Sequence, residues 1–325
     1  MIVTVTANPS VDRTVTLGDR LERGAVVRAV ASSTDPGGKG VNVARVLCGA
    51  GLDALAVLPG NTGDPLLTAL TAAHIEHCAV ATSGQARTNI TVTEPDGTTT
   101  KINEPGNPLP ESTLAALEAE IAVRAESARW VVLSGSLPPG VNPGWYADIV
   151  TMLRDASCLV AVDTSDAPLT ALAEALPAAA PDLIKPNGHE LAQIAGIAPD
   201  RLESAALAGD TSATVAAAQR LLDEGVGAVL ATLGAAGAVL VTPAGAWHAT
   251  PPPITARSTV GAGDSSLAGY ISAHLAGGDP PLCLRTAVAY GSAAAALPGT
   301  TLPTPEQVDA ASVVVTDIST VTDPA

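Results

Sequence analysis

Short apolar strands followed by amphipathic helices recur along this chain, and this alternation constrains its fold more than any other feature. The expected strands are short and apolar, and they cover residues 1–7, 54–58, 130–133, 159–162 and 183–184. The expected helices have apolar residues at helical spacing, and they cover 39–49, 65–73, 143–153, 213–222 and the segment from Gly261 onward. Such alternation predicts an α/β fold, in which a mainly parallel sheet has helices on both faces.

Two segments interrupt the alternation. Residues 14–31 and 88–103 are rich in Thr and Val and alternate in polarity, and the second contains Asp96-Gly97, which is typical of a hairpin turn. Both predict antiparallel strands with one exposed face, so we expect a small sheet beside the main domain. The predicted division is a discontinuous β lid of residues 12–31 and 87–103, with a core of residues 1–11, 32–86 and 104–325. The position of the lid suggests that it covers a site.

Composition and charge exclude several classes of function. The chain is 47% hydrophobic and only 15% charged, so it can bury a core. Its net charge of −16 disfavours binding to nucleic acid or to an acidic membrane surface. The longest apolar stretch, 226–241, is broken by glycines and fits two strands around a turn better than a membrane span. Four scattered cysteines and an N-terminus without a secretory pattern predict a cytoplasmic protein.

Polar residues cluster after the expected strands, where an open parallel sheet collects its ligands. They include Asn8, Asp12, Ser134 to Ser136, Asp163, Lys185 to Asn187 and Thr232 to Gly234. The chain has only three lysines, at positions 39, 101 and 185, and all of them lie in motif-like loops or at strand ends. A lysine there offers a compact cation suited to phosphate. Chance is the alternative interpretation, and we favour phosphate binding over it.

The most informative segment is Ser258 to Ser265, in which glycines lead directly into an amphipathic helix. Without a Cβ, backbone N–H groups can approach an anion closely, and a helix N-terminus adds unpaired donors. Asp264 has two interpretations: it caps the helix, or it takes the proton from a hydroxyl that attacks a phosphorus held by the glycine amides. No Walker A or dinucleotide GxGxxG motif is present, and Gly40 follows Lys39, which excludes an ordinary P-loop.

The segment Asn187 to Glu190 begins another expected helix. An Asn and a Glu one turn apart can hold a hydrated Mg²⁺ against phosphate oxygens. The alternative is a helix cap with an N-terminal carboxylate. The neighbouring Lys185 favours the functional interpretation.

The segments PGGKGVNVARVL (36–47) and STVGAGDSSLAG (258–269) resemble the two signatures of the ribokinase-like carbohydrate kinases, the PfkB family. NPSVD (8–12), SGSLPPG (134–140), KPNGHE (185–190) and TLGAAGA (232–238) occur between them or beside them in the family's order. The resemblance spans roughly residues 1 to 300. It is strongest to the branch of 1-phosphofructokinases and tagatose-6-phosphate kinases, which shares Ser258 where many ribokinase-like enzymes have Asp.

The resemblance implies a three-layer αβα sandwich with a mainly parallel central sheet and a small β-sheet lid. It implies ATP as co-substrate, Mg²⁺ as cofactor and a small phosphosugar as partner. The implied reaction moves the ATP γ-phosphate to a ketohexose phosphate, first of all fructose 1-phosphate, to give fructose 1,6-bisphosphate. Tagatose 6-phosphate and fructose 6-phosphate remain alternative acceptors. A non-catalytic sugar-phosphate sensor is a remote alternative, and a nucleoside acceptor is disfavoured because aromatic residues make up only 2% of the chain.

The site residues follow from the same resemblance, position by position. The implied catalytic residues are Asp264 as base and the amides of Gly261, Ala262 and Gly263 as an anion hole. The implied sugar-phosphate ligands are Asp12, Gly37, Gly38, Lys39, Asn42, Arg87, Asn103 and Ser136, with Arg28 and Lys101 as further candidates. The implied nucleotide ligands are Lys185, Asn187, Thr232, Leu233, Gly234, Ala235, Ala236, Gly237, Gly263, Asp264 and Ser292. The implied metal ligands are Asn187 and Glu190.

The exposed alternating strands also suit a lid-to-lid homodimer, because an unpaired strand edge can pair with a second copy.

Overall fold

The main sheet of this computed structural model, which describes residues 1–319, has ten strands in the order β14-β13-β12-β11-β10-β9-β8-β1-β4-β5. Their bounds are β1 (Ile2–Val5), β4 (Ala54–Pro59), β5 (His77–Val80), β8 (Trp130–Ser134), β9 (Leu159–Asp163), β10 (Leu183–Ile184), β11 (Val229–Thr232), β12 (Ala238–Thr242), β13 (Gly245–Thr250) and β14 (Val314–Asp317). Pairing is parallel from β11 to β5 and antiparallel from β11 to β14. The mainly parallel sheet expected from the sequence is therefore confirmed.

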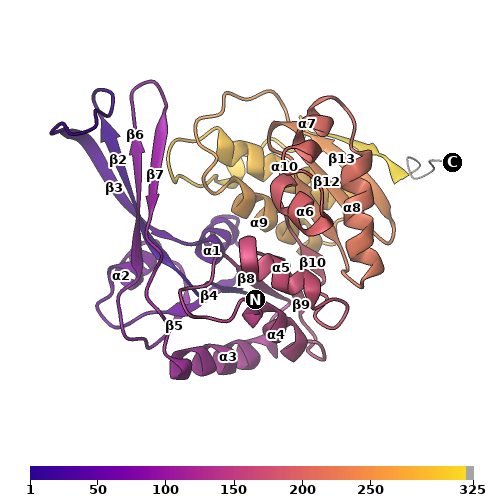
Figure 1. Ribbon diagram of the computed structural model, residues 1–325, viewed down its shortest axis with the longest axis horizontal. Helices are drawn as coiled ribbons and strands as arrows, with labels where there is room; N and C mark the ends of the chain where they lie inside the picture. The colour runs from indigo at the N-terminus through magenta and orange to yellow at the C-terminus, as the bar shows by residue number, and fades with distance from the viewer. Residues whose placement is uncertain (320–325) are drawn as a thin grey trace.

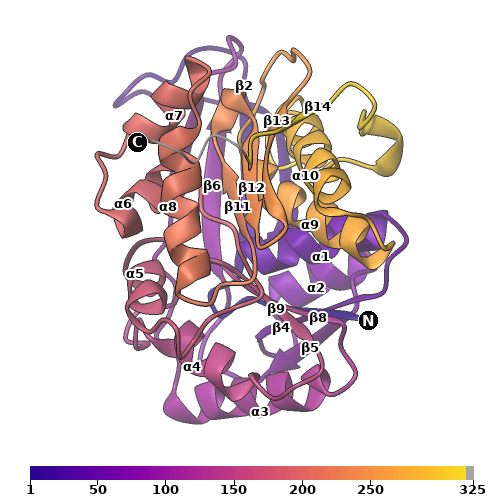
Figure 2. The same ribbon diagram turned by 90° about the vertical axis from the view of Figure 1, so that its right-hand side faces the viewer.

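Helices cover both faces of this sheet and form the outer two layers (Figures 1 and 2). One face packs against α3 (Glu111–Ala125), α4 (Trp145–Met152), α5 (Asp166–Glu174), α6 (Gly188–Ala195), α7 (Arg201–Leu207) and α8 (Ser212–Asp223). The other face packs against α1 (Lys39–Gly49), α2 (Pro65–Ala72), α9 (Ala262–Leu275) and α10 (Pro280–Ala295). Strand residues alternate between the two cores: Val131 and Leu133 belong to one cluster, and Trp130 and Val132 to the other.

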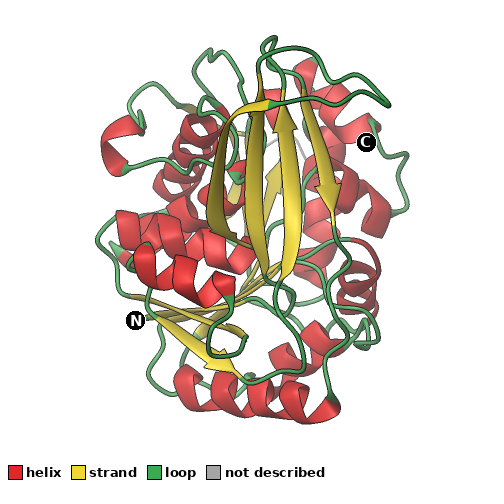
Figure 3. Ribbon diagram, turned by 90° about the vertical axis from the view of Figure 1, so that its left-hand side faces the viewer, coloured by secondary structure: helices red, strands yellow, loops and turns green. Residues whose placement is uncertain are grey.

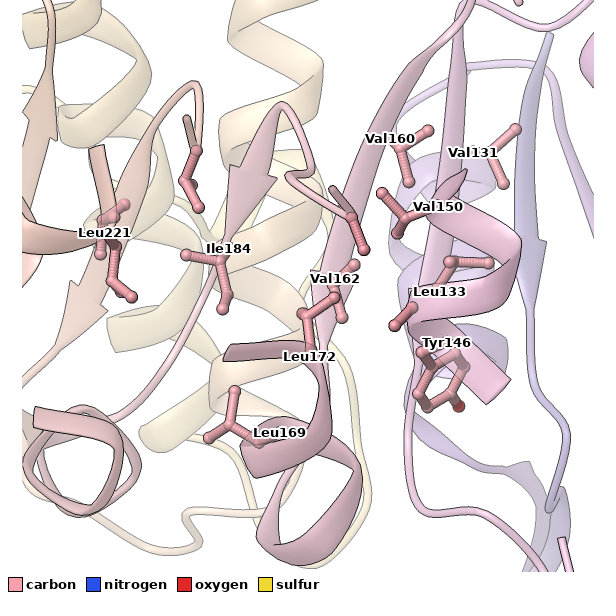
Figure 4. Packing of buried hydrophobic residues seen from close by; sticks show 14 of the residues in the cluster. Val131, Leu133, Tyr146, Val150, Val160, Val162, Leu169, Leu172, Ile184 and Leu221 are labelled. Carbon is pink, nitrogen blue, oxygen red and sulfur yellow. The ribbon is translucent and has the colours of Figure 1, made fainter. Parts of the chain in front are cut away.

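The first of these clusters lies beneath the carboxyl ends of β8 and β9. Figure 4 shows Leu133 above the ring of Tyr146 from α4, and Val162 beside Leu172 from α5. Leu133 and Tyr146 are fully buried. Truncating such a side chain to Ala typically costs about 2–5 kcal/mol, so this core fixes the loops above it.

A separate small sheet has four strands in the order β3-β2-β6-β7. They are β2 (Ser10–Leu17), β3 (Ala29–Gly37), β6 (Arg87–Thr93) and β7 (Thr99–Asn103). The sheet stands away from the helical layers, as Figure 3 shows from its open side. With the main sheet, it confirms the expected fold class.

One expectation for the small sheet is wrong. All its strands were expected to be antiparallel, and the two hairpins are, but the central pair β2–β6 is parallel. Ser10 pairs with Arg87 where both strands leave the core, and both then run outward. Alternating polarity defines the two faces of a strand but not the direction of its neighbour.

The small sheet also extends beyond the segments expected for it. Strand β2 begins at Ser10 and β3 continues to Gly37, so residues 32–37 belong to its pairing as well. The division into a core and a moving lid stays a prediction.

Asp64 caps helix α2, since its Oδ1 accepts a hydrogen bond of 2.8 Å from the Leu66 N–H. Another expectation from the sequence agrees with the structure, since the apolar stretch 226–241 forms β11 and β12 around a turn. Among residues 1–319, no helix combines the length and the apolar character needed to cross a membrane.

Candidate active site

The N-terminus of helix α9 opens at the carboxyl side of the main sheet. Gly261 precedes the helix with φ of 74°, a left-handed conformation that glycine adopts without strain. The Ala262 N–H makes only a long 3.4 Å hydrogen bond to the Thr259 carbonyl. Within residues 1–319, the N–H groups of Gly261 and Gly263 make no hydrogen bond. A helix end with unpaired donors attracts anions.

Asp264 lies in the first turn of α9 and is 6% exposed. Its side chain does not cap the helix; instead, Oδ2 accepts a 2.8 Å hydrogen bond from Asn42 Nδ2 on helix α1. Burial raises the pKa of Asp264 to about 6, with repulsion by Asp163 in the same direction, while Lys39, Asn42 and Lys185 oppose the rise. A carboxylate that titrates near neutral pH is suited to general-base catalysis. Of the two interpretations of Asp264, the helix cap is therefore wrong.

Asp163, the last residue of β9, joins two of the three lysines. Lys39 Nζ donates to its Oδ1 at 2.8 Å, and Lys185 Nζ lies 3.1 Å from its Oδ2. Burial alone would raise the pKa of Asp163, but the two ammonium groups outweigh burial and hold it low. For Lys39, burial would lower the pKa, and the surrounding carboxylates outweigh it. From the sequence, Asp163 was expected only as a polar residue after a strand, although a carboxylate directly after an apolar strand could have indicated a larger role.

Lys185 also lies against the first turn of α9. A Cβ added to Gly263 would lie 3.1 Å from Lys185 Nζ, so the glycine keeps this space open. The ammonium, the unpaired amides and Asp264 therefore share one small region. This region combines positive charge with a carboxylate, and transfer of a phosphoryl group to an alcohol requires both kinds of group.

Asn187 and Glu190 form a capping box at the start of α6. Asn187 Oδ1 accepts from the Glu190 N–H at 2.9 Å, and Glu190 Oε2 accepts from the Asn187 N–H at 2.8 Å. The cap interpretation is confirmed by these contacts. The Oε1 atom of Glu190 takes no part in the cap, and this carboxylate helps to raise the pKa of Lys39. Across residues 1–319 there is no cluster of three or more His, Cys, Asp or Glu that could hold a metal by itself.

The base of the small sheet presents polar side chains in one row. Asp35, Asp12, Asn89 and Asn103 are in register across the four strands. Asp12 Oδ1 accepts from the Ser10 hydroxyl at 2.7 Å and from Asn89 Nδ2 at 3.0 Å. A Cβ on Gly37 would lie 2.3 Å from the Asp12 carboxylate, so only glycine fits there. Asn89 is missing from the site residues implied by the sequence, and its pairing with Asp12 depends on the sheet register.

Arg87 and Ser136, both implied as phosphate ligands, meet at Asn8. Arg87 Nε donates to the Asn8 carbonyl at 3.3 Å, and its Nη1 donates to the Glu104 carbonyl at 2.8 Å. Asn8 Nδ2 donates to the Ser136 hydroxyl at 3.3 Å and to the Pro105 carbonyl at 3.1 Å. From the sequence, Asn8 was expected among the polar residues at the strand ends, but it was given no role in binding. Its own short motif, directly after β1, was the available signal.

Three of the implied sugar-phosphate ligands make no hydrogen bond with Arg87, Ser136 or Asn8 in the part of the chain that the structure describes. Arg28, Lys101 and Asn103 are exposed on the small sheet or on the loop that joins its strands. In the part of the chain that the structure describes, their side chains form no hydrogen bond or ion pair with the core. Lys39 and Gly38 begin helix α1 and lie close to the Asp163 cluster.

The implied nucleotide loop follows β11 beside the start of α6. Asn187 and Thr232 form a parallel bridge, and the Thr232 N–H donates to the Pro186 carbonyl at 3.0 Å. Residues 234–236 form a short 3-10 turn in which Gly234 and Ala235 are exposed and Ala236 is buried. Gly237 closes the turn, and Leu233 is buried in the core. Ser292 is half-buried on α10, next to Gly291, which packs against Ser266 of α9.

Fold and site together define a phosphotransferase that acts on an alcohol. Residues 5–307 match the family described as pfkB family carbohydrate kinase. The chain is 37% identical over 319 residues to a 1-phosphofructokinase of Rhodobacter capsulatus, covering 97% of this chain and 96% of that protein. It is 32% identical over 309 residues to the ATP-dependent 6-phosphofructokinase isozyme 2 of Escherichia coli strain K12, covering 93% and 94% of the two chains.

Solved structures of related proteins support the same family. Phosphofructokinase-2 from Escherichia coli, in complex with substrates and products, superposes with a TM-score of 0.83 at 29% identity and covers 94% of this chain and 96% of that chain. The chain belongs to the pfkB family of carbohydrate kinases, and it is an ATP-dependent sugar kinase. The family resemblance read from the sequence motifs is confirmed.

Proposed function

We propose that this protein is a fructose 1-phosphate kinase that transfers the γ-phosphoryl group of ATP to the C6 hydroxyl and forms fructose 1,6-bisphosphate. The observation behind this proposal is the grouping of Asp264, Lys185 and the open amides of α9, which Asn42 and Arg45 connect to Asp35 of the polar row on the small sheet. Relatives named 1-phosphofructokinase, 37% identical over nearly the whole chain, support the choice of acceptor.

In this reaction the Asp264 carboxylate accepts the proton of the attacking hydroxyl. The sugar oxygen then bonds to the γ-phosphorus, and the bond from that phosphorus to the bridging oxygen of ADP breaks. The amides of Gly261, Ala262 and Gly263, with the Lys185 ammonium, stabilise the charge on the phosphoryl oxygens. Losing one such donor typically lowers the rate about 10²–10³-fold. At pH 7 a carboxyl with pKa near 6 is mostly ionised and ready to act as base.

Asn187 and Glu190 are proposed to hold Mg²⁺ with the ATP phosphates. The donor set fits a hydrated ion, since only Glu190 Oε1 is left outside the capping box. Mg²⁺ usually keeps several waters and binds through one or two carboxylates together with substrate phosphates. When bound, the ion neutralises phosphate charge, and the capping box keeps the Glu190 carboxylate fixed beside the nucleotide loop.

The sugar end of the site is proposed to lie between the two sheets. Asp12, Gly37, Gly38, Asn42 and Asn103 are candidates for the sugar hydroxyls, and Lys39, Arg87 and Ser136 for the existing phosphate. Asp12 is already oriented by Ser10 and Asn89, and Arg87 and Ser136 meet at Asn8. The small sheet acts as a lid that excludes water, which otherwise competes as acceptor.

A steady-state assay with fructose 1-phosphate, fructose 6-phosphate and tagatose 6-phosphate tests the proposal. We expect the highest kcat/KM with fructose 1-phosphate. A higher value with either of the other sugars would reject the proposed acceptor. Binding of nucleotide without turnover of any of them would instead support a sensor.

Fructose 6-phosphate is the second candidate acceptor. The Escherichia coli isozyme 2, named an ATP-dependent 6-phosphofructokinase, is 32% identical to this chain, only slightly less than the 1-phosphofructokinase relatives.

We further propose a homodimer formed by the small sheets. Val30 on β3 is 68% exposed and Ile102 on β7 is 56% exposed, and these two strands are the edges of the small sheet. Sedimentation at micromolar concentration measures the mass, and Ile102→Glu is expected to give monomers. A monomeric wild-type protein would reject the dimer.

A further inference from the structure

The turn that follows β8 has an unusual backbone at Gly135. Its φ is 102°, which L side chains rarely adopt, and its N–H donates to the Asp163 carbonyl at 2.9 Å. The turn lies beside the start of α1, because a Cβ on Gly135 would contact Lys39 Cβ at 3.8 Å. Ser136, the next residue, is exposed. The turn therefore places Ser136 at the surface beside Lys39.

Two buried hydroxyls converge on the Gly135 carbonyl from the core side. Tyr146 Oη donates to it at 3.1 Å and Thr164 Oγ1 donates at 2.9 Å. Tyr146 is fully buried on α4, below Leu133 in Figure 4, and Thr164 is 1% exposed at the end of β9. Burial raises the pKa of Tyr146, so the phenol keeps its proton and remains a donor. Two donors on one carbonyl hold the Gly135–Ser136 peptide firmly in one orientation.

That orientation determines which way the Ser136 N–H points. In a trans peptide the carbonyl and the following N–H point in opposite directions. Because the Gly135 carbonyl is directed into the core, the Ser136 N–H is directed away from it. Across the described chain, this N–H has no hydrogen-bond acceptor.

The Ser136 hydroxyl is oriented in a similar way. Its oxygen accepts a hydrogen bond from Asn8 Nδ2 at 3.3 Å. A hydroxyl that accepts from one side keeps its own hydrogen free to donate elsewhere. Ser136 therefore offers two donors, the N–H and the O–H, beside Arg87, which is anchored on the same Asn8.

We propose that Tyr146 and Thr164 are positioning residues for the sugar phosphate: by holding the Gly135 carbonyl inward, they direct the Ser136 N–H toward the phosphate already on the acceptor. This inference rests on the proposed phosphosugar kinase activity. Neither hydroxyl touches the substrate. Each acts through the Gly135–Ser136 peptide, and without them the carbonyl can rotate outward and repel the phosphate. Hydrogen bonds to charged groups contribute about 1.5–3 kcal/mol, which corresponds to roughly 10- to 150-fold in affinity.

The test compares Tyr146→Phe, Thr164→Val and the double variant with the wild-type enzyme. Steady-state kinetics measure KM for the phosphosugar and for ATP, and kcat, with whichever phosphosugar the wild type uses best. In the double variant we expect KM for the phosphosugar to rise about 10-fold or more, with KM for ATP and kcat within about 2-fold. Each single variant is expected to show a smaller rise, because one donor still holds the carbonyl.

Two kinds of control separate positioning from loss of structure. Thr164→Ser keeps the hydroxyl and is expected to restore a wild-type KM, which a purely packing role of the methyl group would not allow. Tyr290→Phe and Thr214→Val remove buried hydroxyls elsewhere in the two cores. These two variants are expected to leave the KM for the phosphosugar unchanged.

A double variant that melts within a few degrees of wild type and keeps its KM for the phosphosugar would overturn the inference. Equal rises of KM for ATP and for the phosphosugar would also overturn it. If the double variant is unstable, the single variants decide: a rise of KM for the phosphosugar in Tyr146→Phe and Thr164→Val, absent in Thr164→Ser, supports the inference, and an unchanged KM in both rejects it. Failure of the wild type to use any phosphosugar is a different result, which rejects the proposed function.

Discussion

Asn42 Nδ2 lies 2.8 Å from Asp264 Oδ2, and both groups are buried. This hydrogen bond joins the start of α1 to the start of α9, across 222 residues of sequence. It stabilises the ionised carboxylate and therefore opposes the rise of the Asp264 pKa that burial causes. The residue expected to contact the sugar thus already contacts the proposed base.

Replacing Asn42 with Leu removes this donor, so we expect the pKa of Asp264 to rise above about 6. The acid limb of the kcat–pH profile should move to higher pH. The profile is measured from about pH 5 to about pH 9, at saturating concentrations of both substrates. Asn142→Ala, which removes a surface amide that accepts from the Gly144 N–H, is the control. An acid limb at its wild-type position in Asn42→Leu would contradict the prediction.

Asp264→Asn should retain binding of nucleotide and phosphosugar while kcat falls by about 10²–10⁴-fold, the usual contribution of a general base. Binding is measured by calorimetry and turnover by a coupled assay. Near-normal kcat would remove Asp264 from the role of base.

The same variant should affect stability in a pH-dependent way. The folded pKa of Asp264, about 6, lies above its ordinary value of 3.8, so the contribution of this carboxyl to stability is present below pH 4 and is lost as pH rises through 6. Asn cannot ionise, and the Tm of Asp264→Asn relative to wild type should therefore be higher at pH 8 than at pH 5. An equal difference in Tm at both pH values would show that the carboxyl is not strained by burial.

Asp163→Asn leaves two lysines without their shared counter-ion. Removing one partner of a buried ion pair typically costs about 3–5 kcal/mol, and we expect a loss of this order in urea unfolding at pH 7. Because the folded pKa of Asp163 is lowered, its contribution is present above pH 4 and fades as pH falls below that. Asp210→Asn changes an exposed carboxylate and is the control. A loss no larger than in that control would argue against the ion-pair cluster.

Arg87→Ala should raise KM for the phosphosugar far more than KM for ATP, by about 10-fold or more, because a charged hydrogen bond to phosphate is lost. Arg13→Ala is a matched control, since Arg13 is exposed on β2 of the same sheet and alternates in direction with Asp12. Similar changes of both KM values in Arg87→Ala would place the sugar phosphate elsewhere.

Glu190→Gln separates the capping role of this residue from its proposed role in binding Mg²⁺. Glutamine can still accept from the Asn187 N–H, so Tm should change little. The Mg²⁺ concentration for half-maximal rate should rise about 10-fold or more, as the carboxylate charge is lost. Glu224→Gln at the exposed end of α8 is the control. A large fall in Tm with an unchanged Mg²⁺ requirement would mean that Glu190 only caps the helix.

Much of the fold followed from local pattern. The strand from Ala54 and the helix from Lys39 were predictable because a buried strand is apolar throughout and a helix repeats its apolar face every three to four residues. The parallel pairing of β2 with β6 was not predictable, because it depends on where two distant segments leave the core. Edge strands β5 and β14 were missed as well, since partly exposed short strands have no strong pattern.

Some residues of the candidate site were likewise indicated by the sequence, and others were not. Asp264 and Lys185 stood out through their neighbours in sequence, glycines in one case and a strand end in the other. Asp163, Asn8 and Tyr146 did not, because their importance lies in contacts with residues 11 to 128 positions away.

The order of residues alone determined that this chain forms a two-sided parallel sheet and that glycines expose one helix end beside a carboxylate. Periodicity and glycine are local properties, and they act through the backbone of the segment that contains them. Only the tertiary structure decided the proton affinity of that carboxylate and the orientation of the turn at Gly135. Both depend on burial and on charges and hydroxyls from other segments, whose distances no sequence pattern specifies.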